Sequence, residues 1–384
     1  MRSFLTALGK RRRRPSPGTA AGAAALPARD AASLREEILD QGLDADRALT
    51  LADALEREGR LLDALEALVV ANRLRREPSQ ERRIMQLRRR AFAQIDRSLP
   101  PPAWPPVVPE DPPGWRDGPP VVDAGDLTVS VLRNGILRHG AVWVRGLVSQ
   151  RRVARLRHAI DRAIEAYDAA DAGRTTPETA TWYQPLEGIQ NPPIARKWRR
   201  EASAVLAADS PRAFFELLET VHETGLDDLV GAYFGERPVL AAEKVTMFRV
   251  HAGDRRIREA SWHQDGAFLG QGIRTVNAWF ALSRCGRTAP GMALMPVPLD
   301  RILPIGEPGA HYQWALSPDT VARELPGVRV WRPECEEGDV LLFDHLTLHR
   351  TAAEEAMPDW RYAIETWFFA PSVYPVDAST PLVV

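Results

Sequence analysis

Two stretches of this sequence carry most of its information: WHQDG at residues 262–266 and GDVLLFDHLTLHRT at residues 338–351. In the first, His263 lies two positions before Asp265, a spacing that points both side chains to one side of an extended strand. The second stretch reaches His349 just past an apolar run. Two histidines and one carboxylate are the ligands that hold a non-haem Fe(II) ion on one face and leave its other positions open. We therefore predict a metal site formed by His263, Asp265 and His349.

A hydroxyl residue and a basic residue follow His349 closely. Thr351 lies two positions later, and Arg361 lies twelve positions later in the apolar run RYAIETWFF, residues 361–369. A guanidinium is costly to bury unless it meets an anion, and its planar fork suits a carboxylate. An ion pair with Glu365 would satisfy Arg361 within the fold, whereas a bound carboxylate would satisfy it as part of a site.

Composition places the chain among ordinary globular proteins. It has 384 residues, 45% of them hydrophobic and 26% charged, which is enough to bury a substantial core. A net charge of -1 gives no reason to expect nucleic acid as a partner, and no apolar run approaches the roughly 20 residues of a membrane span. Two cysteines are too few for a disulfide framework and agree with a reducing compartment. We expect a cytoplasmic protein without a nucleic-acid or membrane partner.

The sequence divides into four predicted parts. Residues 1–29 are basic and then Ala-rich, which is typical of a disordered tail. Residues 30–97 carry apolar residues at helical spacing on both sides of Gly59 and resemble one tetratricopeptide repeat, a helix–turn–helix unit. Residues 98–124 are Pro-rich and predict a stiff linker. Residues 125–384 begin with helical patterns and continue as short apolar strands between Gly and Pro turns.

Short strands of this kind favour a β-sandwich or jelly roll, and helices ahead of them make the class α+β. Strands are predicted at 244–250, 275–282, 293–295, 328–331, 340–343 and 361–369. A helix is predicted at 212–234, and a polar, irregular loop at 170–200. On the first of these strands, Lys244 and Arg249 are expected to face solvent rather than a pocket. The N-terminal helices either pack on this body or recruit a protein partner.

Taken together, these motifs resemble the phytanoyl-CoA dioxygenase family of Fe(II)/2-oxoglutarate-dependent oxygenases over residues 125–384. The resemblance rests on HQDG at 263–266, NAW at 277–279, the Gly-Asp-to-His stretch at 338–349, and Thr351 with Arg361. It implies a double-stranded β-helix core (jelly-roll or cupin-like) with flanking helices, preceded by a small all-α N-terminal region. It also implies Fe(II), 2-oxoglutarate and dioxygen as cofactor and cosubstrates.

The resemblance assigns roles to individual residues. Iron would be bound by His263, Asp265 and His349, and the offsets to Thr351 and Arg361 favour His349 over its neighbour His345. The implied cosubstrate-binding residues are Arg361, Thr351, Trp279, Gln264 and Asn277, the first two on the distal carboxylate of 2-oxoglutarate. Residues 295–300, MPVPLD, depart from the family's Pro-Gly-Ser-His turn, so the substrate-side rim is expected to be remodelled.

The function implied is that of an oxidoreductase, a dioxygenase that hydroxylates a small-molecule or carrier-bound metabolite. Related halogenases lack the ligand carboxylate, so Asp265 argues against halogenation. One alternative is a catalytically silent scaffold in which residues 30–97 bind a protein partner. Another is a metal-dependent isomerase or hydrolase on a cupin-like barrel, which would leave Arg361 without a purpose.

Overall fold

The computed structural model describes residue 42 and residues 44–97, 101–108, 110–111, 115, 118–189 and 192–384. The tail predicted at 1–29 lies outside the described residues. The helices of four or more residues are α2 (Ala45–Arg57), α3 (Leu61–Leu74), α4 (Pro78–Ala91), α5 (Val129–His139), α6 (Gln150–Asp171), α7 (Pro192–Glu201), α8 (Pro211–Glu223), α9 (Leu226–Phe234), α10 (Arg255–Arg258), α11 (Gly266–Leu269) and α12 (Pro318–Glu324). The strands are β1 (Val121–Asp123), β2 (Ala141–Arg145), β3 (Ala204–Leu206), β4 (Val239–His251), β5 (Thr275–Ala281), β6 (Gly291–Leu294), β7 (Val340–Phe343), β8 (His349–Ala352), β9 (Trp360–Phe369) and β10 (Pro381–Val383).

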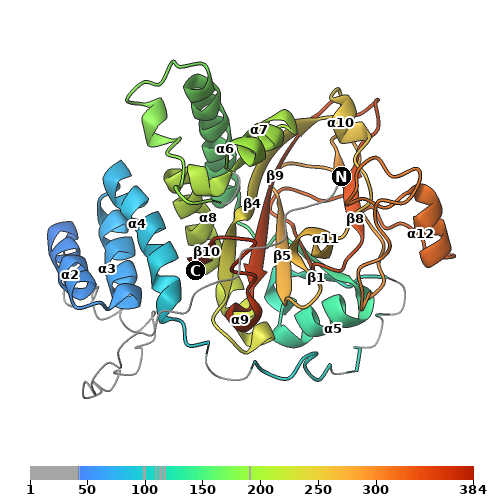
Figure 1. Ribbon diagram of the computed structural model, residues 1–384, viewed down its shortest axis with the longest axis horizontal. Helices are drawn as coiled ribbons and strands as arrows, with labels where there is room; N and C mark the ends of the chain where they lie inside the picture. Colours follow the sequence, from blue (N-terminus) through green and yellow to red (C-terminus); the bar gives the residue numbers. More distant parts are fainter. Residues whose placement is uncertain are drawn as a thin grey trace, which may run out of the picture.

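A large sheet forms the centre of the molecule (Figure 1). Its strand order is β1-β2-β7-β5-β9-β4-β10, with β3 paired to β4, and all pairs are antiparallel except β1 with β2. A small sheet pairs β6 with β8, and single bridges join His263 to His349 and Trp331 to Leu294. The protein is therefore a mixed helix-and-sheet fold built on a sheet core.

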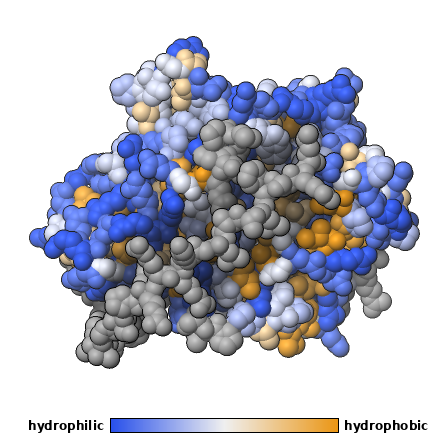
Figure 2. Space-filling view, viewed as in Figure 1, coloured by the Kyte–Doolittle hydropathy of each residue, from blue (hydrophilic) through white to orange (hydrophobic). Residues whose placement is uncertain are grey.

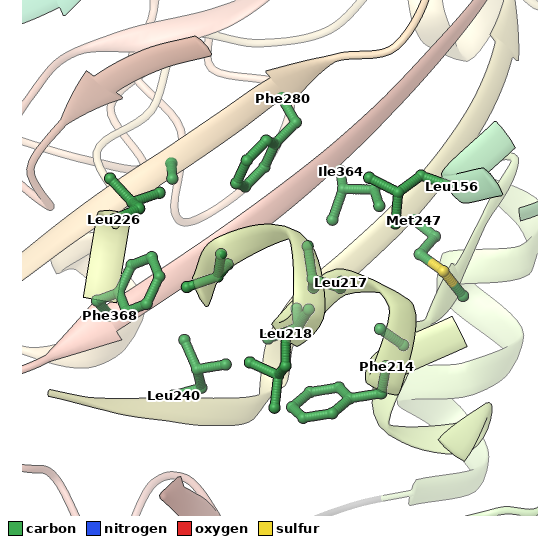
Figure 3. Close-up of a cluster of buried hydrophobic side chains, with 14 of the residues drawn as sticks. Leu156, Phe214, Leu217, Leu218, Leu226, Leu240, Met247, Phe280, Ile364 and Phe368 are labelled. Carbon is green, nitrogen blue, oxygen red and sulfur yellow. The ribbon is translucent and has the colours of Figure 1, made fainter. Parts of the chain in front are cut away.

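Alternation along β9 separates the two faces of the large sheet. Ile364 and Phe368 are fully buried against the helix layer, and Figure 3 shows Ile364 near Leu217 of α8 and Phe368 near Leu226 of α9. Arg361 and Glu365 lie on the other face of β9 and line a cavity, whereas Ala363, Trp367 and Phe369 on that face belong to a second hydrophobic core. Both faces of β9 therefore carry apolar residues, and Arg361 and Glu365 lie on the face that borders the cavity.

The helix layer differs from the sequence prediction at one point. The helix predicted at 212–234 is two helices, α8 and α9. Gly225 separates them with φ +66°, a left-handed conformation that only glycine adopts readily. Apolar periodicity continues through the break because both helices pack on the same sheet face, so the periodicity alone did not reveal the break.

The N-terminal helices α2, α3 and α4 share a hydrophobic core with the large sheet. Figure 1 places them at the left of the molecule, and the side of them seen in Figure 2 is mainly hydrophilic. Two ion pairs attach them to α8: Arg73 lies 2.6 Å from Glu219, and the buried Glu81 lies 3.0 Å from Arg212. The region is therefore packed on the main body, and its likeness to a tetratricopeptide repeat stays a prediction.

The Pro-rich segment predicted at 98–124 contains no helix or strand in its described part before β1, which begins at Val121. Trp104 anchors it, because the indole packs edge-on to Tyr233 at 5.4 Å and lies under the guanidinium of Arg274 at 5.1 Å. Further contacts join Trp115 and Asp111 to His139, so the segment is held against the main body at more than one point.

Most predicted strands are confirmed, namely those that correspond to β4, β5, β6, β7 and β9. The strand predicted at 328–331 is wrong, since only a single bridge forms there, at Trp331. The loop predicted at 170–200 is also wrong in part, because α7 occupies residues 192–201. In the described part of the chain, no helix combines the length and apolar character needed to cross a membrane.

Candidate metal and cosubstrate site

A cavity of about 670 Å³ lies between the large and the small sheet. Its walls come from β4, β5 and β9 on one side and from β6 and β8 on the other, with α7 and the segments around residues 256–268 and 312–314 at the rim. This volume is in the range of pockets that hold a small molecule. The predicted metal residues and most of the predicted cosubstrate residues line it.

The structure brings His263, Asp265 and His349 together, with one potential ligand atom from each lying within 4.8 Å of the others. His349 begins β8, and reciprocal backbone hydrogen bonds of 3.0 Å join it to His263. Asp265 is not in a strand, contrary to the sequence prediction, because its backbone is helical (φ -65°, ψ -21°) and caps α11. Its carboxylate makes no capping hydrogen bond, so the turn into α11, rather than strand alternation, points it at the histidines.

Both histidines are held in the same tautomer by backbone carbonyls. Nδ1 of His263 lies 3.0 Å from the oxygen of Ser261, and Nδ1 of His349 lies 2.9 Å from the oxygen of Thr347. A proton on Nδ1 leaves Nε2 as a lone pair, which is the arrangement of histidine ligands to metals. Burial lowers the pKa of His263 to about 4 and also lowers the pKa of His349, so both rings are neutral near pH 7.

Asp265, the third residue of this group, forms an ion pair with a lysine. Nζ of Lys244 lies 2.8 Å from Oδ1 of Asp265, while Oδ2 is buried without a hydrogen-bond donor and lies 3.4 Å from Nε2 of His349. Burial alone would raise the pKa of Asp265, but the charge of Lys244 holds it below its usual range. The ionised Oδ2, which accepts no hydrogen bond, and the Nε2 lone pairs of the two histidines together form a set of donor atoms that suits a divalent cation. Lys244 therefore faces the cavity, contrary to the prediction that it faces solvent.

Arg361 occupies another part of the cavity lining and is only 2% exposed. Its Nη1 donates to the carbonyl of Gly291 at 3.1 Å, and its Nε has no partner. The guanidinium lies near the rings of Trp279 and Phe248, at 5.7 and 5.8 Å. Burial lowers its pKa to about 10, which leaves it a cation at neutral pH. Among the described residues it forms no ion pair, so its charge faces the cavity uncompensated.

Glu365, the alternative partner considered for Arg361, is used elsewhere. Its carboxylate accepts a hydrogen bond from the indole of Trp367 and forms no hydrogen bond with Arg361 in the described structure. Burial, and then the charge of Asp265, raise the pKa of this carboxyl. Asn277 also lines the cavity, and neither atom of its buried amide has a hydrogen-bond partner. The cavity therefore contains a cation and an amide that the fold itself leaves unsatisfied.

Of the remaining predicted residues, Thr351 and Trp279 line the cavity and Gln264 does not. The amide of Gln264 donates to the carbonyls of Arg301 and Leu346, at 3.0 and 2.6 Å, and accepts from the amide of Leu303 at 2.7 Å. Contrary to expectation, Gln264 does not line this cavity, and its amide instead joins segments that lie apart in the sequence.

His345 is likewise outside the ligand group. Its ring lies 3.1 Å from the hydroxyl of Thr275 and 3.2 Å from the carbonyl of Gln271. The choice of His349 over His345 as the third member of the cluster agrees with this geometry.

The sequence prediction missed several cavity residues, because they belong to segments without a strong local pattern. Arg199 of α7 donates to the hydroxyl of Thr246 at 2.9 Å and to the carbonyl of Glu243. Trp198 of α7 and the loop residues Tyr312 and Trp314 also line the cavity. A signal existed for α7, since Pro-Pro at 192–193 is compatible with the start of a helix.

The sequence model of the phytanoyl-CoA dioxygenase (PhyH) family matches residues 136–355. No curated protein matches the chain.

Among solved structures, the non-heme alpha ketoglutarate dependent carbocyclase SnoK from nogalamycin biosynthesis aligns with TM-score 0.42 and 16% identity over 66% of this chain and 87% of that one. AviO1 from Streptomyces viridochromogenes Tue57 aligns with TM-score 0.40 and 21% identity over 62% and 93% of the two chains. EvdO2 from Micromonospora carbonacea var. aurantiaca, complexed with 2-oxoglutarate, aligns with TM-score 0.38 and 15% identity over 64% and 89%.

Proposed function

The chain belongs to the phytanoyl-CoA dioxygenase family, and we propose that it hydroxylates a small-molecule or carrier-bound metabolite as an Fe(II)- and 2-oxoglutarate-dependent oxygenase. The cofactor is Fe(II), with 2-oxoglutarate and dioxygen as cosubstrates, and a His–Asp–His group is available to hold the metal. The strongest support for the proposal comes from Arg361. Arg361 is a buried guanidinium without an ion pair in the described structure, and it lines the same cavity as that group.

A buried cation of this kind needs an anionic partner, and a carboxylate matches its planar fork. We assign this partner as the distal carboxylate of 2-oxoglutarate. The hydroxyl of Thr351, on β8, lines the same cavity and can donate to the same group. The free amide of Asn277 offers both a donor and an acceptor to the cosubstrate.

Bound Fe(II), together with 2-oxoglutarate and dioxygen, supplies the oxidising power for insertion of oxygen into a C–H bond. The residues of this chain supply position. Carbonyl contacts fix the tautomers of His263 and His349, and Lys244 holds Oδ1 of Asp265 so that Oδ2 faces the histidines.

The large and small sheets, with the cavity between them, are consistent with the two halves of a double-stranded β-helix, and we propose this as the core of an oxygenase domain at 125–384. The helical region at 30–97 is proposed as a unit packed on it. The catalytically silent scaffold is the weaker alternative, because it leaves the free charge of Arg361 and the donor-free oxygen of Asp265 without a role.

The test is an anaerobic titration of the purified full chain with Fe(II) and then with 2-oxoglutarate. We expect one iron site and 2-oxoglutarate binding that requires the metal, followed by succinate formation on exposure to oxygen. Asp265→Ala should abolish all three signals. Absence of iron binding by the wild-type chain would refute the proposal, and iron binding without any affinity for 2-oxoglutarate would favour the isomerase or hydrolase alternative.

A further inference from the structure

We propose that the substrate is a molecule with a planar, apolar ring system, received by an aromatic wall that extends outward from the metal ligands. The aromatic wall consists of Phe268, Tyr312 and Trp314. This inference rests on the proposed function, because it names the class of molecule that the oxygenase site would oxidise.

The aromatic wall begins at a metal ligand. The ring of Trp314 lies 5.4 Å from the ring of His263 in an edge-on arrangement, with an interplanar angle of 82°. Tyr312 stacks on Trp314 at 4.8 Å with their planes only 3° apart, and Phe268 lies 5.1 Å from Trp314. A flat ring placed against these side chains would therefore lie beside the metal site.

Part of the aromatic wall is left uncovered by the rest of the protein. Phe268 is 42% exposed and Tyr312 is 45% exposed, and Trp198, on the neighbouring helix α7, is 52% exposed. These three residues line a single cavity. Large apolar side chains left exposed together mark a binding surface more often than those exposed singly. Their π faces favour a planar ring over a saturated body of the same size.

The charges of the cavity argue against a polyphosphate carrier such as coenzyme A. Four basic and four acidic side chains line it in the described structure. At the rim, Arg256 lies 3.8 Å from Glu201 and 3.5 Å from Asp254, and Glu259 pairs with Arg255 at 2.7 Å. Bound Fe(II) and the two carboxylates of 2-oxoglutarate add charges that cancel. The mouth therefore presents no excess of positive charge to attract several phosphates.

The experiment compares three probes by titration calorimetry on the full chain, loaded with Fe(II) and 2-oxoglutarate without oxygen. The probes are 2-naphthol, its saturated analogue decahydro-2-naphthol, and octanoyl-coenzyme A. We expect 2-naphthol to bind with one site per chain and about two- to tenfold more tightly than the saturated analogue, the range expected for aromatic pairing. Trp314→Leu should remove this preference. The matched control is Trp360→Leu, an indole that is 53% exposed but outside the cavity, and it should keep the preference.

Equal affinity for the planar and saturated probes, or tighter binding of octanoyl-coenzyme A than of 2-naphthol, would overturn the inference. The comparison of probes on the wild-type chain decides this even if Trp314→Leu fails to fold. Because loading with 2-oxoglutarate is measured first, absence of the planar preference in the loaded wild-type chain refutes the inference alone. Failure to load refutes the proposed function instead.

Discussion

Lys244→Met should destabilise the protein strongly without metal and only weakly with metal. In the wild-type protein, Nζ of Lys244 lies 2.8 Å from Oδ1 of Asp265, and the two side chains are 16% and 5% exposed. Methionine keeps most of the apolar stem but removes the charge that compensates the buried carboxylate. Metal-free Asp265 would then retain only its contact with His349, at 3.4 Å.

The magnitude follows from the burial of the pair. Removing one partner of a buried ion pair costs about 3–5 kcal/mol. Because Lys244 keeps some contact with solvent, we expect a loss of about 2–3 kcal/mol in the metal-free protein. A divalent cation at Oδ2 would replace the missing charge, so the loss should fall to about 1 kcal/mol when metal is bound. The difference corresponds to metal binding that is about five- to thirtyfold tighter in the variant, since a like charge beside the metal has been removed.

The assay is urea unfolding with a chelator and, separately, with Fe(II) under anaerobic conditions, combined with calorimetric titration of the metal. Lys197→Met is the matched control, because Lys197 is an exposed lysine on α7. Without metal, Lys244→Met should unfold at a clearly lower urea concentration than this control. Equal midpoints for the two variants, or an equal loss with and without metal, would refute the reasoning.

Four further outcomes are expected. Asp265→Ala should lose iron on purification and succinate formation with it, as measured by metal analysis, and retention of iron would contradict the ligand assignment. Arg361→Met should weaken 2-oxoglutarate by about ten- to a hundredfold, the value of a charge-assisted hydrogen bond, while binding of 2-oxobutyrate, which lacks the distal carboxylate, stays unchanged in calorimetry. The pKa of His263 is lowered by burial to about 4, below the value of about 6.5 in the unfolded chain. Between these two pH values the unfolded chain therefore binds more protons than the folded chain. The free energy of unfolding of the metal-free protein should fall by up to about 3 kcal/mol as the pH falls from 6.5 to 4. A urea midpoint that does not change over this range would contradict this expectation. Gly338→Ala should lower the melting temperature, because Gly338 has φ +97° and a Cβ there would lie 2.4 Å from the oxygen of Val148; an unchanged melting temperature would show that the turn relaxes.

Periodicity and side-chain chemistry in the local sequence were sufficient to predict the strand that carries Arg361 and Glu365. The apolar run at 361–369 predicted β9, and its period of two placed Arg361 and Glu365 on one face of the sheet. A buried arginine twelve residues after His349 already indicated an anion site, because burial of a guanidinium costs free energy wherever it occurs. These features depend on neighbours in sequence and on the chemistry of single side chains.

Other features could not be predicted in this way. The helical break at Gly225 was missed because apolar periodicity continues across it, and the helix α7 was missed because its segment has no strong apolar pattern. Gln264 was assigned to the cosubstrate by resemblance, yet its amide joins loops that are distant in sequence. Lys244 was expected in solvent, and only the approach of the segment that follows β4 brings Asp265 to its ammonium group.

By itself, the sequence determined which residue types were available for the metal, their order along the chain, and the strand that carries Arg361. Only the tertiary structure decided that Asp265 meets its histidines through the turn into α11, that Lys244 holds one of its oxygens, and that the aromatic wall lies beside His263. The physical reason is the range of the forces involved. Backbone periodicity acts over a few residues, whereas these contacts join segments whose approach is decided by burial of the whole core.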